Sequence, residues 1–359
     1  MRAMIPSAIL FLFLLLVSLP SSHQFSTTTT LLATITPSTP QQLGEFTRIN
    51  RRLTESARPI VEHYDLTIPR NVAFNGDHQR GSHATDTNFG VPLIPYNMAT
   101  TFQERLVKKA SSPSSSSIAD SLITLSHSPV YTLGSGPQKT ANILLNQPSS
   151  PHQTTPIPII PTRRGGEVTF HGPGQLVVYP ILNLNSKYKK DLHWYLRGVE
   201  EVIIRGVRLA SVDLLKGGRG LEEIPNLVRL PGVTGVFLPT SNSDSSTPPP
   251  PNYKVSSLGI SARHWITLHG ASLNVFPQSL IGYTGIKACG LENVEAGCLW
   301  NWFKDHGIID ESTERERVWL AVKRGVVEAF SEVFECNIVE PQHGAAFHVD
   351  EGEMTGEWL

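Results

Sequence analysis

The segment RGGEVTFHGPGQ at 164–175 is the part of the chain richest in residues that could line a reactive site, and Arg164 and His171 bracket its predicted strand. Two adjacent glycines let a backbone approach a ligand closely, and a proline between two glycines forms a stiff turn. On a strand, Val168 and Phe170 would share one face. The polar side chains would share the other: Glu167, Thr169 and His171. This pattern indicates the edge of a pocket, although a hairpin with a structural histidine explains it equally well.

Lys254 and Cys289 are two further residues that could take part in one reaction. Lys254 begins the segment KVSSLGI, and Cys289 is followed by glycine in ACG at 288–290. A lysine beside a thiol lowers the pKa of that thiol and so favours the nucleophilic thiolate. Each residue also has an ordinary interpretation, because edge lysines extend their ammonium groups to solvent and lone cysteines are often buried apolar residues.

His269 interrupts a strand-like run at 265–275 and is followed by glycine, so it could face a site or occupy a turn in the core. The other cysteines, Cys298 and Cys336, lack the setting of Cys289. The chain has three cysteines in all and no CxxC pair, which disfavours a disulfide framework and a structural zinc site. One reactive thiol is therefore the simplest interpretation, and Cys336, which follows an amphipathic helix, is expected to be structural.

The elements that would position these residues alternate between helix and strand. Apolar residues at helical spacing predict helices around 98–106, after a capping Asp191, and at 318–330. Runs rich in β-branched and aromatic residues predict strands on both sides of Pro129, a strand, turn and strand over 168–184, a long-looped hairpin from 232–238 and 253–260, and a strand at 265–275. Because no strict βαβ rhythm appears, an α+β fold is favoured over a doubly wound sheet.

The composition allows one large domain or two modest ones. The chain has 359 residues and a formal net charge of -1. Non-specific electrostatic binding to nucleic acid needs a strong basic excess, so it is not expected. We predict a catalytic domain at 58–345, a C-terminal tail at 346–359, and two polar surface inserts at 111–117 and 240–251, because serine- and proline-rich segments cannot bury enough apolar surface to fold.

Residues 1–57 are predicted to be a targeting segment that is removed. An apolar run at 8–19 follows Arg2 and is too short to span a bilayer comfortably. A Ser/Thr-rich stretch without acidic residues comes next and leads to Arg48, Arg51 and Arg52, as in transit peptides. A signal-like part before a transit-like part favours a plastid. A mitochondrion and secretion are the alternatives, and the few cysteines do not favour secretion.

Taken in order, RGGEVTFHGPGQ, KVSSLGI, LHGASLNV and ACG resemble the octanoyltransferase family of lipoate biosynthesis. The resemblance implies an α+β fold in which a mixed sheet has flanking helices, similar to the catalytic domain of biotin and lipoate ligases. It also implies that Cys289 accepts the acyl group and that Lys254 lowers the thiol pKa and moves the proton. The implied substrate-binding residues are Arg164, Gly165, Gly166, Glu167, Val168, Thr169, Phe170, His171, Ser257, Leu258, Gly259, His269, Gly270 and Ala271.

The partners that the resemblance implies are octanoyl-acyl carrier protein as donor and a lipoyl domain as acceptor, either of a 2-oxoacid dehydrogenase or of the glycine-cleavage system. A thioester is already activated, so no cofactor or metal is expected, and after processing the protein is not expected to be a membrane protein. The chain departs from the family pattern in two places. Ala288 replaces the usual proline before the nucleophile, and Glu295-Ala296 replaces a frequent threonine-serine pair.

Three other functions are compatible with these residues. An ATP-dependent lipoate or biotin ligase on the same fold would have no need of Cys289. A papain-like hydrolase would use Cys289 with His171 or His269 and would release free acid. A catalytically inactive homologue would bind acyl carrier protein without turnover, although the Lys254 and Cys289 pair disfavours it.

Overall fold

A computed structural model describes residues 58–68, 72–75, 90–112, 120–136, 156–215, 227–238, 252–286, 294–341 and 347–350. The chain divides into two units, Met1–Arg58 and Pro59–Leu359, and the fold below is that of the second unit. The predicted targeting segment, the insert at 240–251, most of the insert at 111–117 and Cys289 lie outside the described residues.

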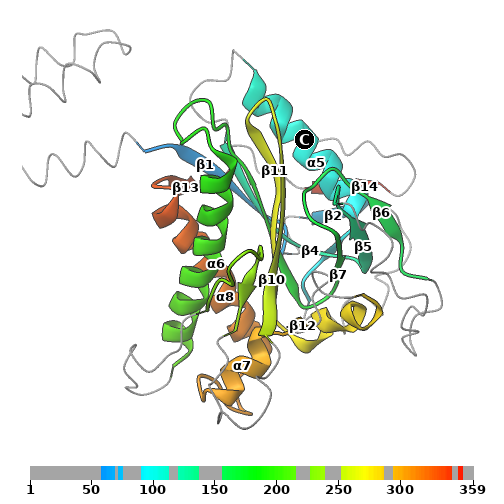
Figure 1. Cartoon of the computed structure of the whole chain (residues 1–359), viewed down its shortest axis with the longest axis vertical. Coiled ribbons are helices and arrows are strands. Elements are labelled where there is room, and N and C mark those ends of the chain that lie inside the picture. The colour runs from blue at the N-terminus through cyan, green and yellow to red at the C-terminus, as the bar shows by residue number, and fades with distance from the viewer. Residues whose placement is uncertain are drawn as a thin grey trace, which may run out of the picture. The chain divides into compact units, whose positions relative to one another are not determined.

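The centre of the fold is a nine-stranded mixed sheet (Figure 1). Its main path runs β12 (Val294–Ala296), β10 (Asn252–Arg263), β11 (Ile266–Asn274), β8 (Gln175–Ile181), β4 (Asp120–His127), β1 (Ile60–Asp65) and β13 (Asn337–Val339). Off this path, β3 (Leu93–Ile94) pairs with β4, and β9 (Val236–Phe237) pairs with β10. The pairs among β10, β11, β8 and β4 are antiparallel, and those among β4, β1 and β13 are parallel. The predicted α+β class is confirmed.

A three-stranded sheet forms the wall that carries the first motif. It contains β6 (Ile159–Pro161), β5 (Val130–Leu133) and β7 (Val168–His171), with β5 in the middle. The predicted strand, turn and strand over 168–184 is present as β7 and β8, but the two are not a hairpin, because β7 pairs with β5 while β8 pairs with β4 and β11. The turn between them includes Gly174 at φ +79°, a conformation that favours glycine. A small separate pair joins β2 (Val72–Asn75) to β14 (Phe347–Asp350).

Helices cover both faces of the central sheet because its strands are apolar on both sides. Leu122 and Val178 pack with α6 (Leu192–Leu214) and α8 (Arg315–Val333), whereas the neighbouring Ile123 and Val177 pack with α5 (Tyr96–Ser111). This alternation along β4 and β8 is the two-residue period of a strand. Figure 1 shows α6 and α8 on one side of the sheet and α5 on the other.

The three predicted helices are confirmed, with their ends now defined. Asp191 caps α6 by accepting hydrogen bonds from the backbone N–H groups of His193 and Trp194 at 2.9 and 3.1 Å. Helices α6 and α8 cross closely, since a Cβ on Gly325 would lie 2.3 Å from the Gly206 carbonyl oxygen. Two helices have no counterpart in the sequence prediction: α7 (Leu299–Asp305) and the 3₁₀ helix η3 (Pro277–Gly285).

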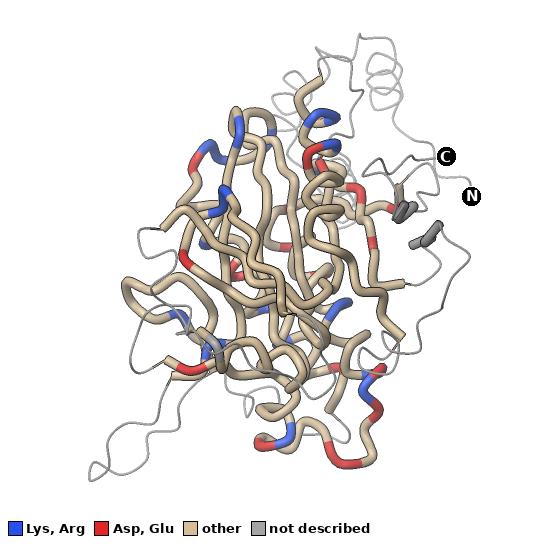
Figure 2. The backbone as a smooth tube through the Cα atoms, turned by 90° about the vertical axis from the view of Figure 1, so that its right-hand side faces the viewer, with Lys and Arg blue, Asp and Glu red and all other residues tan. Residues whose placement is uncertain are grey.

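Charged residues are interspersed along the described backbone, without a segregated basic segment (Figure 2). This distribution agrees with the near-neutral total charge of the chain. Among the described residues, no helix combines the length and the apolar character that a membrane crossing requires.

Candidate active site

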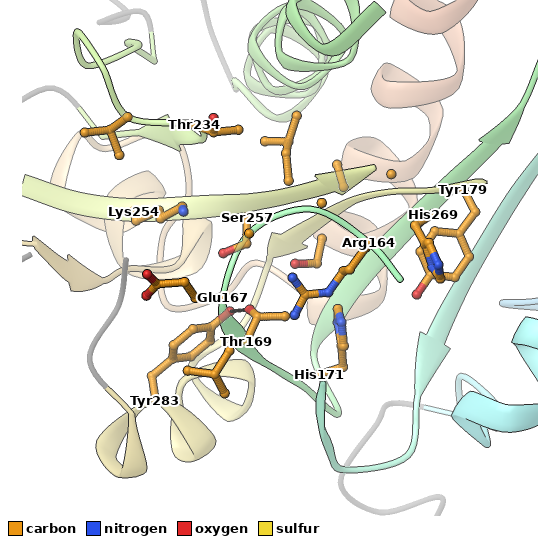
Figure 3. Close-up of a pocket in the computed structure, with 18 of the residues that line it drawn as sticks. Arg164, Glu167, Thr169, His171, Tyr179, Thr234, Lys254, Ser257, His269 and Tyr283 are labelled. Carbon is orange, nitrogen blue, oxygen red and sulfur yellow. Dashed lines mark hydrogen bonds between the residues drawn. The ribbon is translucent and has the colours of Figure 1, made fainter. Parts of the chain in front are cut away.

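A cavity of about 280 Å³ lies among β7 and the loop before it, the hairpin of β10 and β11, and the segment that precedes β9. Its size is near the lower end of small-molecule pockets, roughly 300 Å³. Figure 3 shows Lys254 towards one end, Tyr179 and His269 towards the other, and Arg164 between them. The lining residues are Tyr96, Arg164, Gly166, Glu167, Val168, Thr169, His171, Tyr179, Gly232, Val233, Thr234, Lys254, Ser257, Leu258, Gly259, His269, Gly270, Ala271, Ser272 and Tyr283.

Three predicted sequence motifs meet at this cavity, one from the segment that includes β7 and two from the adjacent strands β10 and β11. Of the predicted site residues that the structure describes, all except Gly165 and Phe170 line it. The Phe170 side chain points away, because it alternates with Thr169 and His171 along β7, and it packs against Tyr131 in a separate apolar cluster. Gly165 instead donates its backbone N–H to the Ile260 carbonyl at 2.9 Å, which joins the wall to β10. Cys289 lies outside the described residues.

Arg164 joins the two sides of the cavity and provides a buried positive charge. Its Nη2 donates to the Thr132 carbonyl at 2.7 Å and to Thr132 Oγ1 at 2.8 Å, and its Nη1 donates to the Gly165 carbonyl at 3.0 Å. A Cβ on Gly134 or Gly259 would lie within 2.9 Å of the Arg164 side chain, so glycine is required on both sides of it. Burial lowers the pKa of Arg164, yet a guanidinium remains charged near neutral pH.

Lys254 is a buried lysine whose side chain lies at the cavity. The residue is 8% exposed and lies on β10, where it pairs with Phe237 of β9 on one side and with Ala296 of β12 on the other. Its Nζ lies 6.0 Å from the centroid of the Phe237 ring. A lysine that only extended to solvent at a strand edge would be exposed, so the buried position excludes that interpretation.

A cluster of neutral histidine and tyrosine rings closes the other end of the cavity. The His127 ring lies 5.1 Å from Tyr96 and 5.4 Å from His171, measured between centroids. His127 Nδ1 lies 2.8 Å from the Ile94 carbonyl and Nε2 lies 2.9 Å from the Tyr179 hydroxyl. These partners assign the neutral tautomer in which Nδ1–H donates and Nε2 accepts.

His269 has an unusual backbone for a residue within a strand. Its φ is +59°, which is rare for a residue with a side chain and is typical of functional sites. The backbone N–H of His269 donates to Gln103 Oε1 of α5 at 2.7 Å. The next residue, Gly270, has no room for a Cβ, because that atom would lie 2.2 Å from the Val178 carbonyl oxygen. Glycine at position 270 is therefore required by the close approach of β11 to β8.

Burial keeps these histidines neutral and makes stability depend on pH. Desolvation lowers the pKa of both His127 and His269 to about 4, and that of His171 well below its usual value. The unfolded chain, with histidine pKa values near 6.5, therefore binds more protons between pH 6.5 and 4, so stability falls as the pH is lowered through that window. Burial raises the pKa of Asp120 to about 6, which works in the opposite direction.

We expect His127→Gln to weaken this pH dependence. Lowering the pKa of His127 from about 6.5 to about 4 corresponds to about 3 kcal/mol. Between pH 7 and pH 4.5 the variant should therefore lose about 2 kcal/mol less unfolding free energy than the wild type. Urea unfolding at the two pH values measures this, with the exposed His193→Gln as control. Equal losses in all three proteins would show that His127 is not held neutral by burial.

Several lining residues were not predicted from the sequence. Tyr96 begins α5, Tyr179 lies within the apolar strand β8, and Tyr283 belongs to η3. Tyr283 connects η3 to the wall through its hydroxyl, which lies 3.2 Å from Thr169 Oγ1. None of these tyrosines belongs to a recognisable motif. The unpredicted non-aromatic lining residues are Gly232, Val233, Thr234 and Ser272.

The two described cysteines have the properties of structural residues. Cys298 is 1% exposed and precedes α7, and burial raises the pKa of its thiol. Cys336 is fully buried after α8, and its Sγ lies 3.9 Å from the Phe330 carbonyl oxygen, which confirms its predicted structural role. Among the described residues, no group of three or more His, Cys, Asp and Glu side chains is placed to hold a metal ion.

Comparisons with known proteins place most of the chain in one family. The model of the lipoyl protein ligase A/B catalytic domain matches residues 95–280. The chain is 38% identical over 248 residues to an octanoyltransferase of Nostoc sp. PCC 7120, which is 69% of this chain and 91% of the relative. It is 35% identical over 245 residues to the chloroplastic octanoyltransferase LIP2p2 of Arabidopsis thaliana, covering 68% of this chain and 76% of the relative.

Solved structures give a weaker similarity. The bipartite lipoate protein ligase of Thermoplasma acidophilum aligns with a TM-score of 0.43 and 15% identity, over 71% of this chain and 83% of the other.

Proposed function

The chain belongs to the octanoyltransferases of the lipoyl protein ligase A/B family, and from that premise we propose that it transfers octanoyl groups from acyl carrier protein to lipoyl-domain lysines through an acyl-enzyme on Cys289. Octanoyl transfer itself follows from the family. The donor, the acceptor and the covalent intermediate are the proposed parts. The observation that carries the proposal is the meeting of three separate motifs, with Lys254 among them, around one cavity.

The proposed reaction has two balanced steps. The Cys289 thiolate attacks the carbonyl carbon of the octanoyl thioester, the carbon–sulfur bond to the carrier breaks, and the carrier thiol leaves with a proton from Lys254. The amine of the target lysine then attacks the new thioester, the bond to Cys289 breaks, and the surplus proton of the amine returns to Lys254. Splitting the transfer in this way replaces one difficult step by two easier ones, and Lys254 serves first as acid and then as base.

The cavity supplies binding and electrostatics for these steps. Val168, Leu258 and Ala271 give it an apolar lining against which an acyl chain could pack. The buried Arg164 guanidinium carries a positive charge, and a nearby charge of that sign favours a thiolate and stabilises a developing oxyanion. The neutral histidines at the far end add no competing charge at neutral pH, because burial lowers the pKa of His127 and His269 to about 4 and that of His171 well below its usual value.

Incubation of the mature domain with octanoyl-acyl carrier protein, without ATP, tests the proposal directly. We expect intact-protein mass spectrometry to find one octanoyl adduct that hydroxylamine removes, as it removes thioesters, and that added lipoyl domain displaces. Peptide mapping should place the adduct on Cys289. Modification that requires ATP and free acid would instead identify a ligase, release of free octanoate would identify a hydrolase, and carrier binding without an adduct would identify an inactive homologue.

We further propose that the protein acts in a plastid. The Arabidopsis relative is described as chloroplastic, and the serine- and threonine-rich N-terminal sequence resembles a transit peptide. Fusing residues 1–57 to a fluorescent protein in plant cells tests this, because the fusion should co-localise with chlorophyll. Co-localisation with a mitochondrial marker would support the alternative.

A further inference from the structure

Glu200 on α6 is a buried carboxylate whose two oxygens have different partners. The side chain is fully buried. Its Oε2 accepts hydrogen bonds from Arg197 Nη1 at 2.6 Å and from Arg229 Nε at 3.0 Å, and its Oε1 accepts the backbone N–H of Gly235 at 3.1 Å. A carboxylate tolerates burial only when it is paired and hydrogen-bonded. Here the ion pairs involve Oε2, and the hydrogen bond from the Gly235 backbone involves Oε1. The effect of the ion pairs can therefore be separated experimentally from that of the backbone hydrogen bond.

Gly235 lies directly against the end of the Lys254 side chain. Its φ is +142°, and a Cβ built on it would lie 2.5 Å from Lys254 Cε and 3.1 Å from Nζ. The ammonium end of Lys254 therefore occupies the space that only a glycine leaves open. The residues just before Gly235 line the cavity beside it, and Figure 3 shows Thr234 near Lys254. A displacement of this segment would change the volume available to the lysine.

The segment around Gly235 has little regular structure of its own. Val228 and Phe237 exchange two backbone hydrogen bonds of 2.9 Å, which close the base of the loop between them. Within that loop, Arg229 on one arm and Gly235 on the other both bind the carboxylate of Glu200. One buried side chain thus joins the two arms of the loop to a long helix.

We infer that Glu200 is a positioning residue for Lys254. It fixes the backbone of Gly235 and thereby holds the lysine ammonium at the cavity. The inference rests on the proposed catalytic role of Lys254. It assigns a role to Glu200 of α6, which contacts Lys254 through the loop between Val228 and Phe237. The hydrogen bond from Gly235 to Oε1 is the critical contact, so an amide that retains this acceptor should preserve the function.

Three variants separate the hydrogen bond from the ion pairs. Glu200→Ala removes both, and Arg197→Gln removes one ion pair from a half-exposed arginine. Glu200→Gln keeps one oxygen for the Gly235 N–H, while its NH2 group replaces the oxygen that accepts from Arg197 and Arg229. We expect Glu200→Ala to lower kcat by about 10- to 100-fold, since small misplacements of a catalytic group have effects of that size. The KM for octanoyl-acyl carrier protein should stay nearly constant. Glu200→Gln should retain most of the activity, and Arg197→Gln should match the wild type.

A second measurement reports on Lys254 without requiring transferase activity. Competitive acetylation with acetic anhydride over a range of pH, followed by mass spectrometry, gives the reactivity of Lys254 relative to the exposed Lys190. In Glu200→Ala, both the relative reactivity and the pH at its midpoint should change, and Glu200→Gln should restore them. If the wild type transferred no octanoyl group but Lys254 reactivity still followed Glu200 in this way, the proposed function would fail while the positioning role stood.

Two outcomes would overturn the inference. The first is unchanged Lys254 reactivity and kcat in a folded Glu200→Ala protein. The second is equal loss in the Ala and Gln variants, which would assign the effect to charge rather than to the Gly235 hydrogen bond. If Glu200→Ala does not unfold cooperatively in a thermal melt, Gly235→Ala replaces it, because the added Cβ displaces Lys254 while Glu200 remains. Normal kcat and Lys254 reactivity in that variant would also refute the inference.

Discussion

Replacing Cys289 by serine or alanine should abolish octanoyl transfer. Removal of a covalent nucleophile commonly lowers kcat on the order of 10⁴-fold or more. Alanine has no group that could accept the acyl chain, and a serine hydroxyl is not ionised by a neighbouring ammonium at neutral pH as a thiol is. The measurement is the rate of lipoyl-domain octanoylation from octanoyl-acyl carrier protein, with the acyl-enzyme followed in parallel by intact-protein mass spectrometry. Both variants should show no adduct.

Cys298→Ala is the matched control for the Cys289 variants. Cys298 is buried at the start of α7 and burial raises the pKa of its thiol, so it lacks the exposure and the thiolate character that a nucleophile needs. We expect this variant to keep its kcat while it loses some thermal stability, because a buried sulfur is removed. Retained activity in Cys289→Ala, or an adduct that disappears in Cys298→Ala, would require a different nucleophile.

The fold was predictable where sequence periodicity is strong. The spacing of Phe102 and Leu106 identified α5, and the capping Asp191 located the start of α6. The strand β1 was missed because its apolar alternation is broken by polar residues. One of these, Glu62, is 5% exposed and is neutralised by Lys109 of α5 at 2.6 Å. That contact spans 47 positions, so no local pattern could reveal it.

The strand pairings that define the sheet could not be predicted from the sequence either. Strands β12 and β13 have three residues each, and a strand of that length carries no reliable periodicity. They exist because β10 and β1 offer them partners. The turn at 172–174 has residues that are also typical of a hairpin turn. It nevertheless joins two strands of different sheets, and a local sequence does not reveal which strands pair.

The candidate site divides into a part that motifs identify and a part that they do not. The glycines that follow Arg164 and His269 stand out in the sequence, and the structure requires two of them: Gly166 has φ +82°, and Gly270 has no room for a Cβ. Tyr179 is indistinguishable from its apolar neighbours, although its hydroxyl binds His127. The role of Glu200 is even harder to predict from the sequence, because an acidic residue on an amphipathic helix is ordinarily assigned to the solvent face. Its burial depends on two arginines and on a loop from another part of the chain.

Lys254→Ala should lower kcat by about 10²- to 10⁴-fold, the usual contribution of a general acid and base. If the Lys254 ammonium lies beside Cys289 as we propose, its removal should raise the pKa of the Cys289 thiol towards the ordinary value of about 8.5, so less thiolate is present at neutral pH. Alkylation of Cys289 by iodoacetamide as a function of pH measures this change separately from turnover. Lys190→Ala, at an exposed lysine over the Trp265 ring, is the control and should leave both quantities unchanged.

The buried position of Lys254 makes chemical rescue a sharper test than the loss alone. Truncation to alanine leaves a space beside Gly235 that a small primary amine could enter, since the lysine end fills that space in the wild type. Added ethylamine should therefore restore part of kcat in Lys254→Ala, saturate with concentration, and have no effect on Cys289→Ala. Lys254→Arg should not substitute, because a guanidinium keeps its proton. Full activity in Lys254→Arg would mean that only the positive charge is needed, and proton transfer would then have to be assigned to another group.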